Sequence, residues 1–484
     1  MGALARALVA TLLGILLTPA PGALGTNPGL VARITDKGLE YAAREGLVTL
    51  QKKLRETKLP DFFGDFRIKH VGRGHYEFHS LDIPSCELSG SALKPLAGRG
   101  LSLTISDSSV QVQGRWKVRM SFLKMDGHFN VHVKGITISV TLLLGSEDSG
   151  RPTVTTSSCS SHHPHIRDLD VDISGDLRWL LKLFHDQIES KFRKMLETKI
   201  CSMIDKSVTS DLQPYLQTLP VIAEIDSFAG VDYSLTEAPR ATANMLDIMF
   251  KGEIFHLNHR SAVPFLAPAI NVPEDHDRML YFAVSNYVFN TASRVYYQAG
   301  YLNFSITDDM IPPDSIIRLT TKSFRAFLPL IGKLYPNMNL ELQGALLRAP
   351  LLTFSPGNLS LAPQLGIDAF VLLPNSLKQF VFRLGVTTNI SATLAFNTSK
   401  ITGLLTPGRV QVELKESKLG FFNVEMMEAL LNYYIRETLY PKVNDKLAEG
   451  FPLPLPRHIQ LHDLLLQIHK DFLFLGANVQ YMRV

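Results

Sequence analysis

The residues between Leu101 and Gly145 alternate between apolar and polar side chains, and this period of two constrains the fold more than any other feature. One face would carry Val110, Val112, Trp116, Val118 and Phe122, and the other Arg115, Lys117, Arg119 and Ser121. Alternate side chains of a β-strand point to opposite faces, so we expect long strands with one buried face and one basic face. The alternation changes phase at Gly135, which indicates a β-bulge.

Helical spacing is found on both sides of this strand-rich segment. The first helical run begins after Thr35, a residue type that caps helices, and ends before Pro60. A second run extends from Asp176 to about Leu212 and repeats apolar residues on one face over many turns. The first half of the chain therefore combines two amphipathic helices with long strands.

The second half repeats this plan. A helical pattern begins at Asp275 to Asp277 and continues through Val284 and Val295, strands follow, and a last helix is predicted from Val424 to about Leu447. The pattern Leu-x-Pro occurs in the final helical run of each half, at Leu212/Pro214 and Leu439/Pro441. A duplicated unit of more than 200 residues is therefore predicted.

A chain of 484 residues exceeds the size at which single hydrophobic cores stop growing. We predict an α+β protein with two similar domains, at residues 26–255 and 278–484. The linker is placed at residues 256–277, where Pro264, Pro268 and Pro273 interrupt regular structure.

Residues 1–25 have the features of a secretory signal peptide, namely a basic start at Arg6, an apolar run from Ala7 to Leu17 and small residues before Thr26. An apolar run of about a dozen residues is too short to span a bilayer, and no later uninterrupted run reaches the roughly 18 residues required. The expectation is a secreted, extracellular protein.

Cysteines and glycosylation motifs fit export. Three cysteines, Cys86, Cys159 and Cys201, allow one intramolecular disulfide and leave one thiol, and their number does not choose the pair. The motif Asn-x-Ser/Thr without proline at x is found at Asn303, Asn358, Asn389 and Asn397. All four lie in the second half, which is therefore expected to carry N-linked glycans.

The sequence lacks the local signatures of common enzymes: Gly-x-Ser-x-Gly, His-Glu-x-x-His, a Walker loop and Cys-x-x-Cys. His162, His163 and His165 form a compact group, but Pro164 interrupts it and no nearby cysteine or paired acid completes a ligand set. We interpret this group as an exposed loop, and we expect no catalytic activity, metal or cofactor.

Two basic clusters, rather than the formal net charge of +4, indicate an anionic ligand. They consist of Lys52, Lys53, Arg55, Lys58, Arg67, Lys69 and Arg73, and of Arg115, Lys117, Arg119 and Lys124. The second cluster interleaves Trp116 and Phe122 with its cations, and cations beside exposed aromatic rings suit a ligand with phosphates and acyl chains. A basic outer strand can equally serve solubility alone. A nucleic-acid ligand is disfavoured because no groove-reading motif is present.

Three segments resemble the family of lipopolysaccharide-binding and bactericidal/permeability-increasing proteins, and the similarity extends from the signal peptide to Val484. They are Asn27–Thr35 (NPGLVARIT), Gln113–Arg119 (QGRWKVR) and Ser210–Pro220 (SDLQPYLQTLP). The ending Phe472–Val484 and the moderate charge resemble the lipopolysaccharide-binding plasma members more than the basic bactericidal members.

The resemblance implies an elongated boomerang of two barrel-plus-helix domains joined through a central antiparallel sheet, each with an apolar pocket for phospholipid. It also implies a Cys159–Cys201 disulfide and an unpaired Cys86. Lipid A would bind at the tip of the N-terminal barrel, where the matching positions are Arg67, Arg73, Arg115, Lys117, Arg119 and Lys124, with Trp116 among them. Where the family tip resembles Val-Arg-Lys-Ser, this chain has Val118-Arg119-Met120-Ser121, with one cation fewer.

The implied function is that of a secreted acute-phase pattern-recognition protein of innate immunity. It would extract lipopolysaccharide monomers from aggregates or outer membranes and transfer them to a monocyte co-receptor for Toll-like receptor signalling. Phospholipids, lipoproteins and lipoteichoic acid are further implied partners. Two alternatives are a directly bactericidal protein, against which the low net charge argues, and a plasma carrier of phospholipid or sterol esters, which would not need a basic tip.

Overall fold

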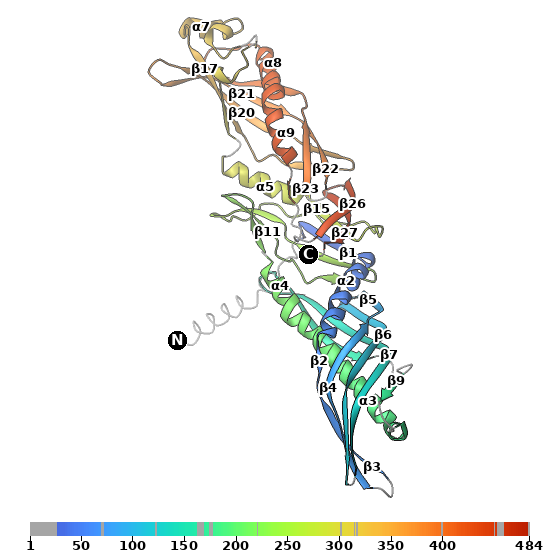
Figure 1. Cartoon of the computed structure of the whole chain (residues 1–484). Helices are drawn as coiled ribbons and strands as arrows, with labels where there is room; N and C mark the ends of the chain where they lie inside the picture. The colour runs from blue at the N-terminus through green and yellow to red at the C-terminus, as the bar shows by residue number, and fades with distance from the viewer. Residues whose placement is uncertain are drawn as a thin grey trace, which may run out of the picture.

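The structure, a computed structural model of the chain, is elongated, with β3 near one end and α7 near the other (Figure 1). It describes residues 27–68, 72–121, 123–161, 169–173, 178–219, 221–300, 303–313, 315, 318–397, 400–449, 451–452 and 459–482. The predicted signal peptide and the group His162, His163 and His165 lie outside the described residues. Helices and strands are both abundant, which confirms the predicted α+β class.

An eight-stranded antiparallel sheet covered by helices forms the N-terminal barrel. Its strands are β2 (Lys58–Leu59), β3 (Phe62–Ile68), β4 (Gly72–Glu87), β5 (Gly90–Leu96), β6 (Gly100–Met120), β7 (Leu123–Ser146), β8 (Pro152–Ser161) and β9 (Leu169–Ile173). The alternation predicted strand β6 correctly, because Val110, Val112 and Val118 are all buried. The bulge is also confirmed: β7 has one residue more than β6 between two adjacent pairs of the register, and Gly135 has a φ of 72°.

The helices of the N-terminal barrel are α2 (Asp36–Arg55), α3 (Arg178–Lys206), the π-helix η1 (Ser207–Leu212) and α4 (Gln213–Thr218). As predicted, the Thr35 side chain caps α2 and accepts a hydrogen bond from the Gly38 amide. Buried Phe192, Leu196 and Ile200 of α3 belong to the same apolar core as the inner face of the sheet. The disulfide Cys159–Cys201 joins β8 to α3, as the resemblance implied.

The C-terminal unit repeats the order of the N-terminal one. Strand β15 (Leu280–Ser285) precedes helix α5 (Asn286–Gln298), as β1 (Leu30–Thr35) precedes α2. The last helical run consists of α8 (Glu425–Tyr434), the π-helix η3 (Ile435–Leu439) and α9 (Tyr440–Glu449), close to its predicted bounds. The prediction of a helix from residue 275 was wrong. Residues 280–285 form a strand instead because β15 pairs with a strand on each side in the centre of the molecule.

The Leu-x-Pro pattern marks the same local structure in both halves. In each half the π-helix ends at the leucine of this pattern, and the proline lies at the beginning of the next α-helix. A proline has no amide N–H to donate to the preceding turn, so the hydrogen bonding must change there, and a π-turn accommodates the change. The shared irregularity supports the predicted duplication.

Two five-stranded sheets build the C-terminal unit. One contains β16 (Phe304–Thr307), β17 (Asn339–Leu346), β20 (Gln364–Leu372), β21 (Lys378–Thr388) and β24 (Val410–Ser417), and the other contains β18 (Leu352–Ser355), β19 (Asn358–Leu361), β22 (Ile390–Phe396), β23 (Lys400–Thr406) and β25 (Phe451–Pro452). Short helices η2 (Asp308–Met310), α6 (Thr321–Phe324) and α7 (Pro329–Leu334) lie between β16 and β17. Helix α8 packs over β24.

A six-stranded central sheet takes strands from both halves of the chain. Its order is β12 (Arg240–Ala241), β13 (Met245–Phe250), β1, β15, β27 (Phe472–Tyr481) and β26 (Ile459–Ile468). Residues 257–279 form neither helix nor strand, and we call them the irregular segment. Because the sheet is shared, the linker at residues 256–277 and the domain bounds 26–255 and 278–484 stay predictions.

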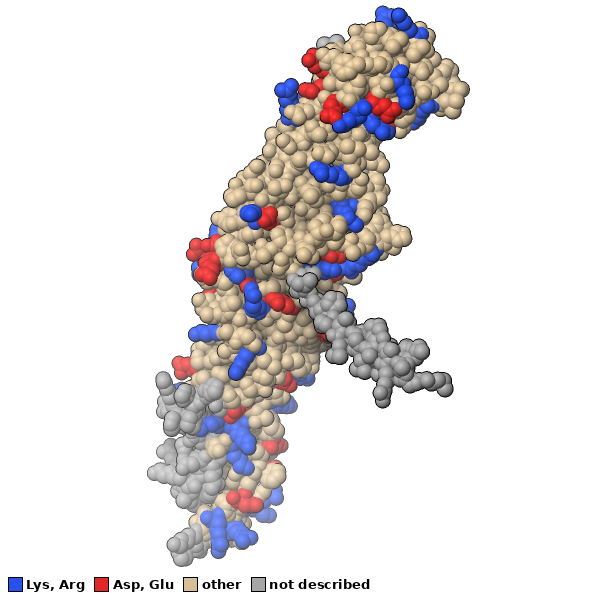
Figure 2. Space-filling model, turned by 180° about the vertical axis from the view of Figure 1, so that it is seen from behind, with Lys and Arg blue, Asp and Glu red and all other residues tan. Residues whose placement is uncertain are grey.

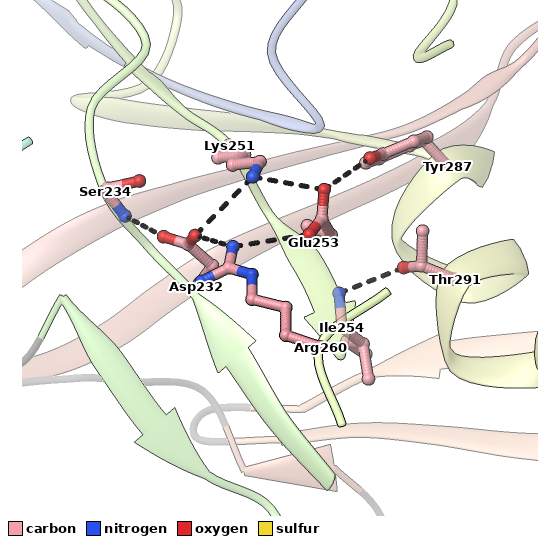
Figure 3. A network of polar contacts seen from close by, with 8 residues as sticks. All are labelled: Asp232, Ser234, Lys251, Glu253, Ile254, Arg260, Tyr287 and Thr291. Atoms are coloured by element: carbon pink, nitrogen blue, oxygen red, sulfur yellow. Dashed lines mark hydrogen bonds and ion pairs between the residues drawn. The ribbon is translucent and has the colours of Figure 1, made fainter. Parts of the chain in front are cut away.

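A polar network lies beside the central sheet, between the strands β11 (Ala229–Asp232) and β14 (Glu253–His256) and helix α5 (Figure 3). Strand β10 (Ile222–Glu224) pairs with β11. Arg260, from the irregular segment, contacts the buried carboxylates of Asp232 and Glu253, and the Tyr287 hydroxyl donates to Glu253 at 2.9 Å. Burial and this carboxylate raise the pKa of Tyr287. The network ties the irregular segment to both halves.

This network predicts acid sensitivity. Burial alone would raise the pKa of Asp232, but hydrogen bonds from Ser234 and Arg260 outweigh burial and hold the pKa below its ordinary value of 3.8. Such a group stabilises the folded state above the unfolded pKa, and the stabilisation is lost as the pH falls through the folded pKa. We expect the free energy of unfolding to fall with acidification from about pH 5, and the fall to be smaller in Asp232→Asn. Urea unfolding at a series of pH values measures both, and equal slopes would contradict the assignment.

The unpaired Cys86 is buried in the core of the N-terminal barrel. Burial raises the pKa of its thiol to about 11, against a smaller lowering by Arg55. A thiol that is both protonated and inaccessible is a poor nucleophile. We therefore expect almost no alkylation of Cys86 by iodoacetamide in the folded protein at neutral pH and complete alkylation in denaturant, as mass spectrometry would show. Rapid labelling of the folded protein would contradict this burial.

Candidate functional site: the basic tip of the N-terminal barrel

Two β-hairpins, β3–β4 and β6–β7, end together at the free end of the N-terminal barrel. Their inner faces are apolar and their outer faces are polar, because strand residues alternate between the two sides. Lys and Arg side chains gather at this end of the molecule (Figure 2). We call the outer surface formed by Arg67, Arg73, His75, Arg119 and Lys124 the basic tip.

The strand register places like charges directly opposite each other in the basic tip. Arg67 of β3 pairs with Arg73 of β4, and Arg119 of β6 pairs with Lys124 of β7. His75 lies opposite Arg119 from the other side, and its Nδ1 is 2.9 Å from the carboxylate of Asp65 in β3. Side chains in such pairs are roughly 5 Å apart at Cβ, and like charges there destabilise the sheet. All four cations are exposed, and none forms an ion pair with another described residue. The arrangement therefore favours binding of a multivalent anion.

Lys117 and Arg115 lie on the same face of β6 as Arg119 but outside the basic tip. Lys117 has Glu77 opposite on one side and Asp126 on the other, so its positive charge is largely offset. Arg115 is exposed but lies four residues from Arg119, about 13 Å along the strand, between His79 and His128. The predicted cations of β6 thus lie on one face, but only Arg119 lies in the basic tip.

The first basic cluster of the sequence does not form one surface. Lys52, Lys53 and Arg55 are in the last turn of α2, where Lys53 pairs with Asp211 at 2.8 Å and Arg55 donates to the Cys86 carbonyl. Only Arg67 and Arg73 of this cluster reach the basic tip, and Lys69 lies outside the described residues. The cations of the first cluster are neighbours in the sequence but not on one surface, because some lie at the end of α2 and others on the strands β3 and β4.

The expectation that Trp116 is exposed among the cations was wrong. Its side chain is 3% exposed and belongs to the inner face of β6, where it packs in the apolar core. The indole ring lies over Gly127 of the neighbouring strand, whose missing side chain leaves room for it. Phe122, the other aromatic residue of that interpretation, lies outside the described residues. Trp116 therefore supports the strand from inside and does not face a ligand.

Phe63 is the exposed aromatic residue that the sequence reading missed. Its side chain is 67% exposed on the outer face of β3, with its ring centroid 5.9 Å from that of His75. Its neighbours Phe62 and Phe66 point inward. Within Phe62-Phe63-Gly64-Asp65-Phe66-Arg67, the period of two could have assigned Phe63 to the face of Asp65 and Arg67.

Met120, at the position where the resemblance implies a cation, is partly buried and packs against the core under the basic tip. The row of His75, Arg119 and Lys124 on the outer face does not include this position. The four predicted glycosylation sites, Asn303, Asn358, Asn389 and Asn397, are all exposed. Glycosylation of these four asparagines stays a prediction.

Among the described residues, no group of His, Cys, Asp and Glu side chains could hold a metal ion.

No helix within the described part of the chain has the length and apolar character needed to cross a bilayer.

Comparison with known proteins covers nearly the whole chain. The chain is 72% identical over 484 residues to the lipopolysaccharide-binding protein of Homo sapiens, with 100% of both chains covered. It is 40% identical to the bactericidal permeability-increasing protein of Rattus norvegicus, with 94% of both covered. A crystal structure of lipopolysaccharide binding protein superposes with a TM-score of 0.68 at 64% identity and covers 95% of this chain and 100% of that one. Residues 38–215 match the N-terminal domain and residues 223–481 the C-terminal domain of one family, so this chain belongs to the LBP / BPI / CETP family.

Proposed function

We propose that this protein binds bacterial lipopolysaccharide through the basic tip of its N-terminal barrel. The observation that carries the proposal is the pairing of Arg119 with Lys124, which leaves two cations side by side without an acidic partner in the described structure. Two relatives, 72% and 68% identical, bear the name lipopolysaccharide-binding protein. Lipid A carries phosphates next to acyl chains, which suits a surface of cations beside an exposed aromatic ring.

The geometry supports a docking step at the surface of an aggregate. The basic tip is the narrow end of an elongated molecule, so it can reach phosphates on a crowded surface while the rest of the protein stays in water. Arg119 and Arg73 offer planar guanidinium groups that can bind phosphate oxygens in pairs, and Lys124 adds a point charge. We propose that docking is followed by extraction of single molecules and their transfer to a monocyte co-receptor, outside the cell.

Binding of fluorescent lipopolysaccharide to the purified protein tests the proposal. We expect saturable binding that weakens as salt concentration rises, since exposed charges more than about 10 Å apart are screened at 0.1 M salt. Deacylated, still phosphorylated saccharide is expected to bind more weakly than the intact ligand. Binding of neutral and anionic glycolipids with equal affinity would contradict a phosphate-directed tip.

Phe63 is expected to supply the apolar part of this contact. Phe63→Ala should lower the affinity for lipopolysaccharide by about tenfold, because about half of a large aromatic surface would no longer be removed from water. The same substitution should leave the affinity for deacylated saccharide unchanged, since the cations remain. Leu266→Ala, at an exposed position in the irregular segment, is the matched control. Equal losses for both ligands would show that Phe63 only maintains the strand.

Two other functions make different predictions. A directly bactericidal protein would kill Gram-negative bacteria without host cells, and a plasma lipid carrier would exchange phospholipid or sterol esters between lipoproteins without needing Arg119 or Lys124. We also propose that phospholipid occupies the apolar interior of the barrels, which lipid extraction and mass spectrometry of the secreted protein can test. Lipoteichoic acid, which also carries phosphates and acyl chains, is a further proposed ligand.

A further inference from the structure

The far end of the C-terminal unit is formed by three connections that the topology brings to one edge of a sheet. Strands β16, β20 and β24 run toward this edge, and β17 and β21 run away from it, because neighbouring strands are antiparallel. The connections are residues 308–338 (described except for 314, 316 and 317), 373–377 and 418–424, and we call the outer surface of their described residues the C-terminal tip. The first and third connections touch, since the rings of Phe327 and Phe422 are 6.1 Å apart. The Lys418 amide of the third connection donates to the Val381 carbonyl of β21, the strand that follows the second connection, at 2.9 Å.

Each of the three connections exposes large apolar side chains. Phe421 is 90% exposed, Leu377 60% and Leu334 58%, and Leu330 and Met310 are also exposed. Scattered apolar residues are normal on a protein surface. Five of them at one end of an elongated molecule indicate a binding surface. Figure 2 shows this end as mainly uncharged, with Lys and Arg side chains and some Asp and Glu side chains on it.

The fold does not require these side chains to be apolar. In α7, Ile331 is buried in the core, whereas Leu330 and Leu334 point to solvent one turn apart. In the loop after β24, Leu419 and Phe422 are buried, and Phe421 between them points away. The inward residues complete the core, so the outward ones add nothing to its packing.

Exposed cations are found in the same connection as Leu330 and Leu334. Lys322, Arg325 and Lys333 are exposed, and none forms an ion pair within the part of the chain that the structure describes. The aliphatic part of Arg325 lies close to Gly332 of α7 and packs against this helix. Over the three connections the sequence has five basic and three acidic residues. The net charge of the three connections is therefore +2, and within them Arg318 pairs with Asp308 and Lys418 pairs with Glu416 of β24.

We propose that the C-terminal tip docks on the surface of an anionic phospholipid bilayer. The apolar side chains would enter the interface between headgroups and acyl chains, and the cations would contact lipid phosphates. A protein partner is less suited because a stable protein interface needs a complementary surface with a buried centre, whereas here exposed apolar side chains come from three separate connections. A bilayer accepts such projections without a matching shape.

This docking does not depend on lipopolysaccharide binding, since the two tips lie at opposite ends of the molecule. A protein attached to a membrane by the C-terminal tip would leave the basic tip free in solution. The two activities can therefore be removed separately.

Leu334→Trp tests the proposal in the full-length secreted protein. The background carries Arg119→Ala and Lys124→Ala, so that the basic tip does not compete for anionic lipid. With vesicles of phosphatidylcholine and phosphatidylserine, we expect the emission of the introduced indole, measured as the difference from the background protein, to shift to shorter wavelength. Brominated acyl chains should quench this emission, and both effects should be smaller with phosphatidylcholine alone.

Leu266→Trp in the same background is the control for this experiment. Leu266 is 81% exposed but lies in the irregular segment, so an indole at this position should show neither the shift nor the quenching. Unchanged emission of Leu334→Trp, or equal changes at both positions, would overturn the proposal.

A second set of variants separates apolar insertion from charge. In the Arg119→Ala/Lys124→Ala background, Leu334→Ser with Phe421→Ser should weaken binding to anionic vesicles by about tenfold or more, since both side chains lose most of their apolar area. Lys322→Gln with Lys333→Gln should weaken it mainly at low salt. All four positions are exposed, so the thermal midpoint and lipopolysaccharide binding should stay those of the parent protein. Vesicle binding unchanged in both pairs would also overturn the proposal.

Discussion

Arg119→Ala together with Lys124→Ala is expected to lower the affinity for lipopolysaccharide by about 30-fold. Each cation at an anionic surface contributes about 1 kcal/mol, and the two lie opposite each other in adjacent strands, so both can bind the same phosphate-bearing surface. Titration of fluorescent lipopolysaccharide at low and physiological salt measures the loss, which should be larger at low salt. Thermal stability should be unchanged or slightly higher, since a like-charge pair is removed.

Lys117→Ala is the matched control for this double variant. Lys117 comes from the same strand and the same face as Arg119, but Glu77 and Asp126 lie opposite it. We therefore expect a loss of no more than about threefold. If Lys117→Ala weakened binding as much as the double variant, the contact surface would extend down the strand, and the central place given to Arg119 and Lys124 would be wrong.

Arg33→Met is expected to destabilise the protein by about 3–5 kcal/mol, the largest effect on stability that we predict. Arg33 donates to both oxygens of Asp247, at 2.7 and 2.9 Å, and to the Pro273 carbonyl at 2.8 Å. Both side chains of this ion pair are buried in the central sheet, so removal of the arginine leaves a carboxylate without its partner in a dry environment. Arg240, whose guanidinium is 3.8 Å from Asp247, offsets only part of the loss.

Chemical denaturation of wild type, Arg33→Met and Arg33→Met/Asp247→Leu measures this cost. The double variant removes the buried charge as well as its partner and should recover much of the stability. A cost below about 1 kcal/mol for the single variant would show that the central sheet does not depend on the pair. Because Arg33 also binds the irregular segment, proteolysis near Pro273 should become faster in the single variant.

Much of the fold could be predicted from the sequence because its signals are local. The alternation in β6 and the helical spacing of α2 and α3 follow from which side chains face the core. The strand at Leu280–Ser285 could not be predicted in this way. Its apolar residues also fit a helical pattern, and pairing with β1 and β27, which are far away in the sequence, decides its structure.

Only part of the candidate site could be predicted, because pairing between strands decides which charged residues become neighbours. The sequence places Arg115, Lys117 and Arg119 on one face of a strand, but it does not show which residues lie opposite them. The register decides that Lys117 faces two acids and that Arg119 faces Lys124. Trp116 was assigned wrongly because its role was inferred from its neighbours in sequence, although its own alternation places it on the inner face with Val118.

Transfer of fluorescent lipopolysaccharide from aggregates to a soluble monocyte co-receptor, with catalytic amounts of this protein, tests the central claim most directly. The proposed function predicts many transfers per molecule for the wild type and for Lys117→Ala. For Arg119→Ala/Lys124→Ala, it predicts that the transfer rate falls by at least the same factor as the affinity for lipopolysaccharide. Equal transfer by the wild type and the double variant would contradict the assignment of the basic tip. Absence of transfer by the wild type would contradict the extraction mechanism itself.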